Sequence, residues 1–255
     1  MSDSDIDLTQ APPLSFTRTD GVRLAYRHQP GRGPTIVFLP GYMSDMQGGK
    51  AQAVAAWAAV NGRAMLRLDY SGCGESEGTF EDATLDTWRD DVLAIIRHIG
   101  SGPVVLVGSS MGGWLMLLIA EALGKQVAAL VGIAAAPDFT EWEYSEAEKA
   151  EIVTTGKYVR PLSGHDGYEP MVTTRHFWES GQANLQLNAE IPISCPVRLI
   201  HGQQDDDVPW QKSVRLAEEL RSSDVQTILV KDGDHRLSRD QDIALLIDVI
   251  AKLPV

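Results

Sequence analysis

The segment Gly108-Ser109-Ser110-Met111-Gly112 holds a serine between two glycines. An apolar run precedes it at residues 103–107, and a second apolar run follows at residues 114–120. These runs predict a buried strand and a buried helix, joined by a tight turn in which glycine avoids steric clashes. The G-x-S-x-G arrangement is typical of a nucleophile elbow, so we predict that Ser110 attacks an electrophilic carbon. The alternative is that these residues form an ordinary strand-to-helix turn.

A serine hydroxyl is a weak nucleophile at neutral pH and needs a base that takes its proton. Of the six histidines, His235 lies just after the last predicted strand, residues 225–230. An acid must hold the imidazole in the correct tautomer. The run Asp205-Asp206-Asp207 follows the preceding predicted strand, residues 195–202, and each carboxylate could reach an imidazole. The order serine, aspartate, histidine, each beyond a strand end, predicts a catalytic triad.

Chemistry at a carbonyl carbon also requires hydrogen-bond donors for the oxyanion that forms. The first amides of the helix after Ser110 have no acceptor within that helix, so the Met111 N–H is one predicted donor. The apolar run at residues 34–39 ends in Pro40-Gly41-Tyr42, in a loop that is suited to supply the second donor. We expect the backbone N–H of Tyr42 to do so, and not its phenol. The alternative here is an ordinary Pro-Gly turn.

The elements that position these residues alternate along the chain. The hydrophobic pattern predicts strands at residues 14–19, 22–28, 34–39, 64–68, 103–107, 127–133, 195–202 and 225–230. It predicts helices at residues 51–60, 84–99, 114–120, 209–220 and 240–251. Alternation of strands and helices predicts an α/β fold, in which a mostly parallel central sheet is covered by helices on both faces.

The segment at residues 138–190 abandons this alternation. Its helical candidates lie at 141–153 and 174–187, among many aromatic residues. We expect a helical cap inserted into a core of residues 14–137 and 191–255, with residues 1–13 as a disordered tail. Four cap aromatics are expected to line an apolar substrate pocket: Trp142, Tyr158, Phe177 and Trp178. The alternative is that they pack the cap onto the core.

Composition limits the partners and the location. A net charge of −13 disfavours nucleic acid and anionic membranes, because the field of the protein repels both. No run approaches the roughly 20 apolar residues that cross a bilayer. Two cysteines imply no disulfide framework, and the acidic N-terminus differs from a secretory or transit peptide. We therefore expect a cytoplasmic protein without membrane insertion.

The elbow and the segment His201-Gly202-x-x-Asp205-x-x-Val208-Pro209 resemble the α/β-hydrolase family. The resemblance implies Ser110 as the nucleophile, Asp205 as the acid and His235 as the base, with Asp206 as the second choice of acid. Chemistry by such a triad needs no cofactor and no metal. The glycine-rich turn at residues 69–76 agrees with this, since it lacks the G-K-[ST] ending of a P-loop and a complete dinucleotide fingerprint.

Three further segments, Pro40-Gly41-Tyr42, Asp69-Tyr70-Ser71-Gly72 and Asp234-His235-Arg236, resemble one branch of that family. Animal members of this branch are mitochondrial and hydrolyse palmitoyl-protein thioesters and acyl-glucuronide esters, so the resemblance implies that the substrate is a small-molecule ester or an acylated protein. The N-terminus departs from a mitochondrial transit peptide, and the cap matches least. For a glucuronide ester, Arg160 or Arg175 could meet the sugar carboxylate.

These features predict a serine hydrolase that cleaves carboxylic esters or thioesters through an acyl-enzyme. Two other reactions stay open, C–C bond hydrolysis and aminopeptidase action, because the elbow and triad are shared and only the cap decides. A serine at position 110 argues against branches that use an aspartate nucleophile. A binding protein without turnover is the remaining alternative.

Overall fold

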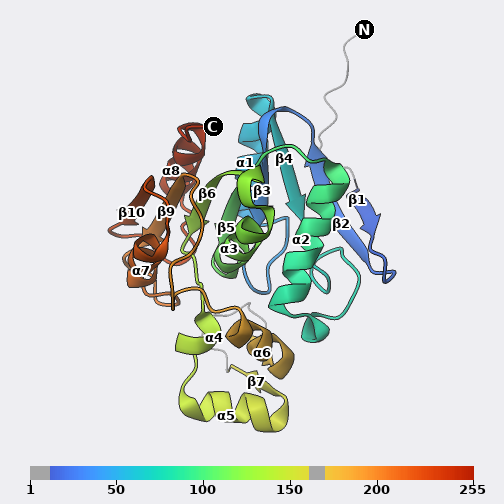
Figure 1. Ribbon diagram of the computed structural model, residues 1–255, viewed down its shortest axis with the longest axis vertical. Helices are drawn as coiled ribbons and strands as arrows, with labels where there is room; N and C mark the ends of the chain where they lie inside the picture. Colours follow the sequence, from blue (N-terminus) through green and yellow to red (C-terminus); the bar gives the residue numbers. More distant parts are fainter. Residues whose placement is uncertain (1–11, 161–169) are drawn as a thin grey trace.

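Eight strands form one sheet in the computed structural model, which describes residues 12–160 and 170–255 (Figure 1). The tail expected at residues 1–13 therefore lies outside the described residues, except for its last two. The strands of the sheet are β1 Leu14–Thr17, β2 Arg23–Gln29, β3 Arg32–Leu39, β4 Arg63–Leu68, β5 Val104–Ser109, β6 Val127–Ile133, β9 Val197–Gly202 and β10 Val225–Val230.

The strand order is β1-β2-β4-β3-β5-β6-β9-β10. Every neighbouring pair from β4 to β10 is parallel, whereas β2 runs antiparallel to both β1 and β4. Parallel strands bury both faces and are rich in apolar residues, as in Val104–Ser109, where every residue is buried. The carboxyl ends of β3, β5, β6, β9 and β10 consequently share one edge of the sheet.

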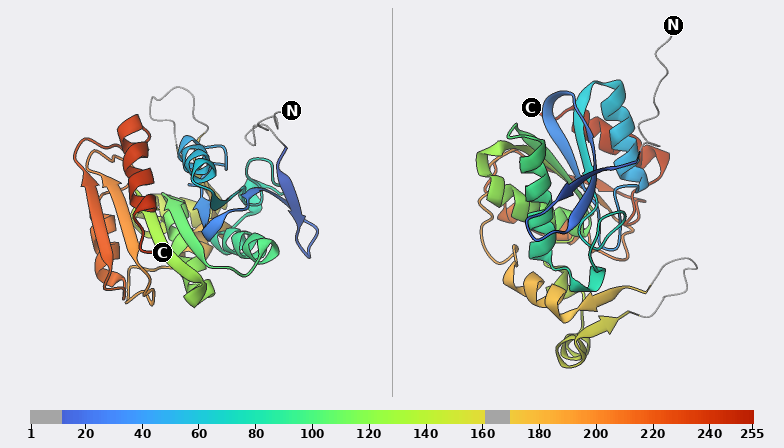
Figure 2. Two further views of the ribbon diagram at one scale, coloured as in Figure 1. Left: turned by 90° about the horizontal axis from the view of Figure 1, so that it is seen from above. Right: turned by 90° about the vertical axis from the view of Figure 1, so that its right-hand side faces the viewer.

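Helices cover both faces of the sheet (Figure 2). On one face, α1 (Gly49–Val60) and α8 (Asp240–Ala251) pack over a core cluster that includes Ile36, Val105 and Val131. On the other face, α2 (Leu85–Ile99), α3 (Met111–Leu123) and α7 (Gln211–Glu219) pack over a second cluster. Two 3₁₀ turns complete this part, at Phe80–Asp82 and Gly124–Gln126. The predicted mostly parallel sheet with helices on both faces is confirmed.

Residues 138–160 and 170–190, which we call the inserted segment, lie between β6 and β9, at the carboxyl edge of the sheet (Figure 1). The segment contains α4 (Phe139–Trp142), α5 (Glu146–Thr155), β7 (Lys157–Val159), β8 (Val172–Thr174) and α6 (Arg175–Ala183). Strands β7 and β8 form a separate antiparallel hairpin, which we did not predict. Three-residue strands are too short to show a period-2 pattern.

The helix predicted at 141–153 is two helices, and the reason is a cap. Ser145 accepts a hydrogen bond from the Glu148 N–H, and the Glu148 side chain accepts one from the Ser145 N–H. This capping box starts a new helix and stops α4 from continuing. The helix predicted at 174–187 begins after Thr174, which caps it, and ends at Ala183.

Asp138 joins the two ends of the inserted segment. Its buried carboxylate accepts hydrogen bonds from the N–H groups of Gln186 (2.7 Å) and Leu187 (2.8 Å). Nearby, the Trp114 indole of α3 donates to the Asn184 carbonyl at 3.0 Å. The segment thus leaves and rejoins the core at one place, beside the helix that follows Ser110.

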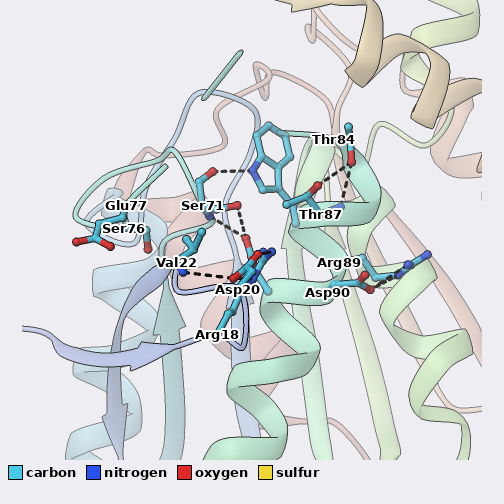
Figure 3. Close-up of polar contacts among 12 residues, drawn as sticks. Arg18, Asp20, Val22, Ser71, Ser76, Glu77, Thr84, Thr87, Arg89 and Asp90 are labelled. Atoms are coloured by element: carbon cyan, nitrogen blue, oxygen red, sulfur yellow. Dashed lines mark hydrogen bonds and ion pairs between the residues drawn. The ribbon is translucent and has the colours of Figure 1, made fainter. Parts of the chain in front are cut away.

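The glycine-rich turn after β4 holds α2 against the sheet. The Ser71 carbonyl accepts a hydrogen bond from the Trp88 indole at 3.0 Å, and the Asp91 carboxylate accepts one from the Ser71 N–H at 2.8 Å (Figure 3). Asp69, buried beside it, accepts from the N–H groups of Met46 and Glu75. The polar groups of this turn therefore serve the packing of neighbouring loops.

Candidate active site

Strained backbone collects at the carboxyl edge of the sheet. Among the described residues, the non-glycine residues with positive φ are Met43, Ser110, Ala134, Asp138 and Leu237. Each lies in a loop or turn that follows β3, β5, β6 or β10. Such conformations cost free energy and are common at functional sites, so this edge is the first place to look for chemistry.

Ser110 occupies the turn between β5 and α3, with φ 54° and ψ −122°. A Cβ at Gly108 would lie 2.3 Å from the Gly112 carbonyl oxygen, and a Cβ at Gly112 would lie 2.2 Å from the Leu39 carbonyl oxygen. Both distances are impossible for a real side chain, so the two glycines are required for this turn. Ser110 is partly exposed there, whereas Ser109 is buried.

The loops after β5, β9 and β10 bring three predicted side chains together. His235 Nε2 lies 3.1 Å from Ser110 Oγ, and His235 Nδ1 lies 2.8 Å from Asp205 Oδ2. Because Nδ1 faces a carboxylate, it carries the proton, which leaves Nε2 free to accept the Ser110 hydroxyl proton. This chain of hydrogen bonds has the order that a serine nucleophile needs.

Asp205 is held rigidly. Its side chain is 0% exposed, and its Oδ1 accepts hydrogen bonds from the N–H groups of Asp207 (3.0 Å) and Val208 (2.7 Å). Burial alone would raise the pKa of Asp205, but hydrogen bonds from His201 and His235 outweigh it and hold the pKa well below its usual range. The carboxylate therefore stays ionised beside the imidazole. Its neighbour Asp206 is exposed, so the structure puts Asp205 on His235.

His201 is a residue to which we assigned no role from the sequence. Its ring is fully buried, and Nε2 lies 3.0 Å from Asp205 Oδ2 and 2.9 Å from the Val208 carbonyl. Since both are acceptors, Nε2 carries the proton and Nδ1 accepts from Ser213 Oγ at 2.7 Å. The sequence contained a signal for this contact, because His201 lies only four residues before Asp205, at the end of the strand that precedes the loop of Asp205.

The loop after β3 lies against Ser110. A Cβ on Gly41 would lie 3.4 Å from Ser110 Cβ, and the Pro40 carbonyl accepts a hydrogen bond from Tyr70 Oη at 3.0 Å. The Tyr42 hydroxyl is engaged elsewhere, because it donates to the Val172 carbonyl of β8 at 2.6 Å. Met111 begins α3, where the first amides have no acceptor within the helix.

Phe177 and Trp178, two of the aromatics expected to line a pocket, make packing contacts. Phe177 is 1% exposed, and its ring centroid lies 4.9 Å from that of Tyr42 and 5.7 Å from that of Phe139. The Trp178 indole donates to the Thr140 carbonyl at 3.1 Å. These placements agree with the alternative role, packing of the inserted segment.

Trp142 and Tyr158, the other two of these aromatics, are partly exposed. The Trp142 indole donates to the Pro137 carbonyl at 2.8 Å, and the Lys212 ammonium lies 4.7 Å from the centre of the Trp142 ring. Tyr158 meets the Tyr144 ring edge-on. Their contact with a substrate stays a prediction.

Two arginines considered for a sugar carboxylate already have partners. Arg160 forms an ion pair with Glu143 and lies over the Tyr144 ring, with its guanidinium carbon 5.4 Å from the ring centre. Arg175 pairs with Glu179 on the surface of α6. Both guanidinium groups are thus engaged within the inserted segment, and their contact with a sugar carboxylate stays a prediction.

A cavity of about 630 Å³ lies between the loop after β3 and the β7–β8 hairpin. Its lining combines apolar side chains with a few polar groups: Met43, Ser44, Asp45, Gly72, Cys73, Gly74, Thr79, Phe80, Glu81, Val159, Pro170 and Val172. None of the four aromatics expected to line a pocket contributes to it. The cavity therefore lies next to the loop that contains Tyr42 and to the glycine-rich turn after β4.

One described group of side chains has ligand atoms close enough to hold a metal ion. Asp205, Asp207 and His235 each offer one such atom within 4.8 Å of the others. Both oxygens of Asp205 already accept hydrogen bonds, which suits a carboxylate that orients His235. In the part of the chain that the structure describes, no helix is both long and apolar enough to cross a membrane.

Comparison with known proteins places these observations in a family. The profile of the alpha/beta hydrolase family matches residues 36–249. The mitochondrial palmitoyl-protein thioesterase ABHD10 of mouse is 42% identical over 254 residues, which cover 96% of this chain and 84% of that protein. The human ABHD10 is 41% identical over 253 residues, which cover 96% of this chain and 82% of that protein.

Solved structures agree. Alpha/beta hydrolase domain-containing protein 10 from mouse superimposes with a TM-score of 0.88 at 40% identity, over 94% of this chain and 97% of that chain. A putative hydrolase from Agrobacterium vitis S4 superimposes with a TM-score of 0.86 at 37% identity, over 94% of this chain and 98% of that chain. The resemblance to the α/β-hydrolase family, which rested on the elbow and on the segment from His201 to Pro209, is confirmed.

The expectation of a cytoplasmic location is contradicted by these relatives. The mouse, human and orangutan proteins, 41–42% identical to this chain, are all named as mitochondrial. An acidic N-terminal sequence was therefore a poor guide to location. By the match over most of its length and by its close structural neighbours, the chain belongs to the α/β hydrolase family.

Proposed function

We propose that this protein is a serine-dependent thioesterase that removes fatty acyl groups from acylated proteins or small thioesters. The observation that carries the proposal is the hydrogen-bonded chain from Ser110 through His235 to Asp205. The names of the mammalian relatives as palmitoyl-protein thioesterases support the substrate class. Carboxylic esters, including acyl-glucuronide-like esters, are the second substrate class for the same machinery.

In the proposed mechanism Ser110 Oγ attacks the thioester carbonyl while its proton passes to His235 Nε2. The tetrahedral oxyanion accepts hydrogen bonds from the N–H groups of Met111 and Tyr42. The C–S bond then breaks, the thiol leaves with the proton from His235, and the acyl group remains on Ser110. Water gives a proton to His235 and attacks this ester. His235 returns the proton to Ser110 as the fatty acid leaves.

The inserted segment is proposed to act as a cap that selects the acyl chain. It lies at the carboxyl edge of the sheet, where the elbow is, and it carries apolar residues on its inner side. Each CH₂ buried in the transition state contributes roughly 0.8 kcal/mol, or about fourfold in kcat/KM. Activity is therefore expected to rise with chain length until the available space ends.

The test combines covalent labelling with a substrate series. A fluorophosphonate is expected to label Ser110, mapped by mass spectrometry, and matched thioesters and esters from acetyl to palmitoyl are expected to show a chain-length optimum. Ser110→Ala should lower kcat by about 10⁴- to 10⁶-fold. Ser109→Ala is the control, because Ser109 is the buried neighbour of the nucleophile. Retention of most activity in Ser110→Ala would overturn the proposal.

A further inference from the structure

Two polar contacts join the described residues of strands β7 and β8 to the core. The Tyr42 hydroxyl donates to the Val172 carbonyl of β8 at 2.6 Å. The Lys157 ammonium of β7 lies 2.9 Å from a Glu81 carboxylate oxygen, with both side chains about half exposed. Exposed ion pairs contribute little, so the Tyr42 hydroxyl is the stronger polar tether of the two.

The Tyr42 ring is held by aromatic rings from both sides of the junction. Phe80 and Trp88 belong to the core, with ring centroids 5.1 Å and 5.8 Å from that of Tyr42. Phe139 and Phe177 belong to the inserted segment, with centroids at 5.8 Å and 4.9 Å. Burial, together with nearby Tyr144, raises the pKa of Tyr42, so its hydroxyl stays protonated and remains a donor.

The backbone of the same residue lies in the loop beside Ser110. Gly41 lies so close that an added Cβ would contact the Ser110 side chain, and Met43 follows with φ 54°. Tyr70 Oη holds the preceding carbonyl, that of Pro40, from the core side. The loop is therefore held at two points. Tyr70 of the core bonds to the Pro40 carbonyl, and the side chain of Tyr42, a residue of the loop, bonds to β8 of the inserted segment.

We propose that Tyr42 is a positioning residue, whose phenol links β8 of the inserted segment to the loop after β3, the loop that carries the proposed oxyanion donor. This inference rests on the proposed function, in which the Tyr42 N–H is an oxyanion donor. A shift of β8 pulls on the Tyr42 side chain and so moves the Tyr42 backbone N–H, which in the proposed function faces the reacting carbonyl. Small displacements of such donors are costly, since about 1 Å of misplacement can cost on the order of 100-fold in rate. The position of the inserted segment thereby sets the rate of acyl transfer as well as the fit of the acyl chain.

The test compares two variants that each lose one phenol hydroxyl bonded to β8. Tyr42→Phe keeps the ring and loses the bond to the Val172 carbonyl. Tyr144→Phe loses the bond to Thr173 Oγ1, which is 2.6 Å long and lies within the inserted segment. With a long-chain acyl thioester, Tyr42→Phe is expected to lower kcat about tenfold with KM nearly unchanged, because the affected donor acts mainly in the transition state. Tyr144→Phe is expected to keep kcat within about twofold of the wild type.

Two results would overturn the inference. One is a kcat for Tyr42→Phe equal to that of the wild type, and the other is an equal fall in kcat for both variants, which would report only loosening of the hairpin. Fluorophosphonate labelling of the same samples separates this inference from the proposed function. Labelling of wild-type Ser110 together with unchanged kcat in Tyr42→Phe removes the role of the phenol alone, whereas no labelling of wild-type Ser110 removes the proposed function.

Discussion

We call the carboxyl edge of the sheet, where Ser110, Asp205 and His235 meet, the triad edge. The triad edge and the inserted segment are held in place by different forces. At the triad edge, buried polar atoms have specific partners: Asp205 Oδ1 accepts from two backbone N–H groups and Oδ2 lies against two imidazoles. In the inserted segment, the Phe177 ring packs on Trp88 and the Phe139 ring on Trp114 of the core, and hydrogen bonds join the segment to the core at separate points, as between Asp86 and Ser180.

This difference suits a division of labour. Hydrogen bonds are directional and hold atoms within a few tenths of an ångström, as a proton-transfer chain requires. Apolar packing is non-directional and tolerates shifts, as a surface that selects among acyl chains requires. Changes at the triad edge should therefore act mainly on rate. Changes in the inserted segment should act mainly on stability and on substrate choice, and the proposed link through the Tyr42 phenol is the one route by which they also act on rate.

The largest expected effect is that of Asp205→Asn. The variant keeps the size of the side chain but removes the charge that fixes the tautomer of His235, so kcat should fall by about 10⁴-fold, or roughly 5.5 kcal/mol. Steady-state kinetics with a long-chain acyl thioester measures it. The control is Asp206→Asn, an exposed neighbour expected to retain wild-type kcat. Equal losses in the two variants would contradict the assignment of Asp205.

The next effect is on stability and comes from Phe177→Ala. Phe177 is buried among the Tyr42, Trp88 and Phe139 rings, so truncation should lower the free energy of unfolding by about 3–5 kcal/mol. Urea unfolding measures the loss. Phe177→Leu, which keeps most of the volume, should lose less than about 1.5 kcal/mol. A loss below 1 kcal/mol in Phe177→Ala would mean that the ring does not join the segment to the core.

A smaller effect follows from the lowered pKa of Asp205. In the unfolded chain an aspartate binds a proton near pH 3.9, whereas the folded protein keeps Asp205 ionised to lower pH. The stabilisation is thus fully present above about pH 3.9 and falls by about 1.4 kcal/mol per unit as the pH decreases below it. Urea unfolding of the wild type and of Asp205→Asn should show a difference that narrows below that pH. A difference that stays constant from about pH 5 to 3 would contradict the lowered pKa.

The smallest expected effect is that of Ser213→Ala. The Ser213 hydroxyl donates to His201 Nδ1, and His201 in turn donates to Asp205, so its loss loosens the carboxylate indirectly. One neutral hydrogen bond contributes about 0.5–1.5 kcal/mol, so kcat should fall about two- to tenfold. Ser222→Ala is the matched control, because Ser222 Oγ accepts only a backbone bond from Asp224 among the contacts described. A larger fall in Ser222→Ala than in Ser213→Ala would exclude a specific route through His201.

The core was predictable because its signals are local and strong. Apolar runs at residues 127–133 and 225–230 gave the bounds of β6 and β10, and α8 was predicted at its observed residues 240–251. Gly108 and Gly112 indicated the tight turn at Ser110. The short stretch after β10 contains a single histidine, His235, which identified the predicted base. Topology then brought these residues together, since parallel strands end at one edge.

The inserted segment was less predictable because its structure depends on contacts that are distant in sequence. Nothing local distinguishes Phe177, which is buried among rings from three other segments, from an aromatic that faces a cavity. The residues alone left Asp205, Asp206 and Asp207 open, because adjacent carboxylates differ only in direction, and only the family resemblance favoured Asp205. The bond from Tyr42 to Val172 joins residues 130 positions apart.

The most direct test of the central claim is to trap the acyl-enzyme during turnover. The protein is mixed with a long-chain acyl thioester, quenched in acid within one turnover, and digested for mass spectrometry. The expected result is one acyl group on the peptide that contains Ser110, together with a burst of thiol release equal to the enzyme present. Thiol release in steady turnover with no acyl group on Ser110 at any quench time, and with no burst, would contradict nucleophilic catalysis by this serine.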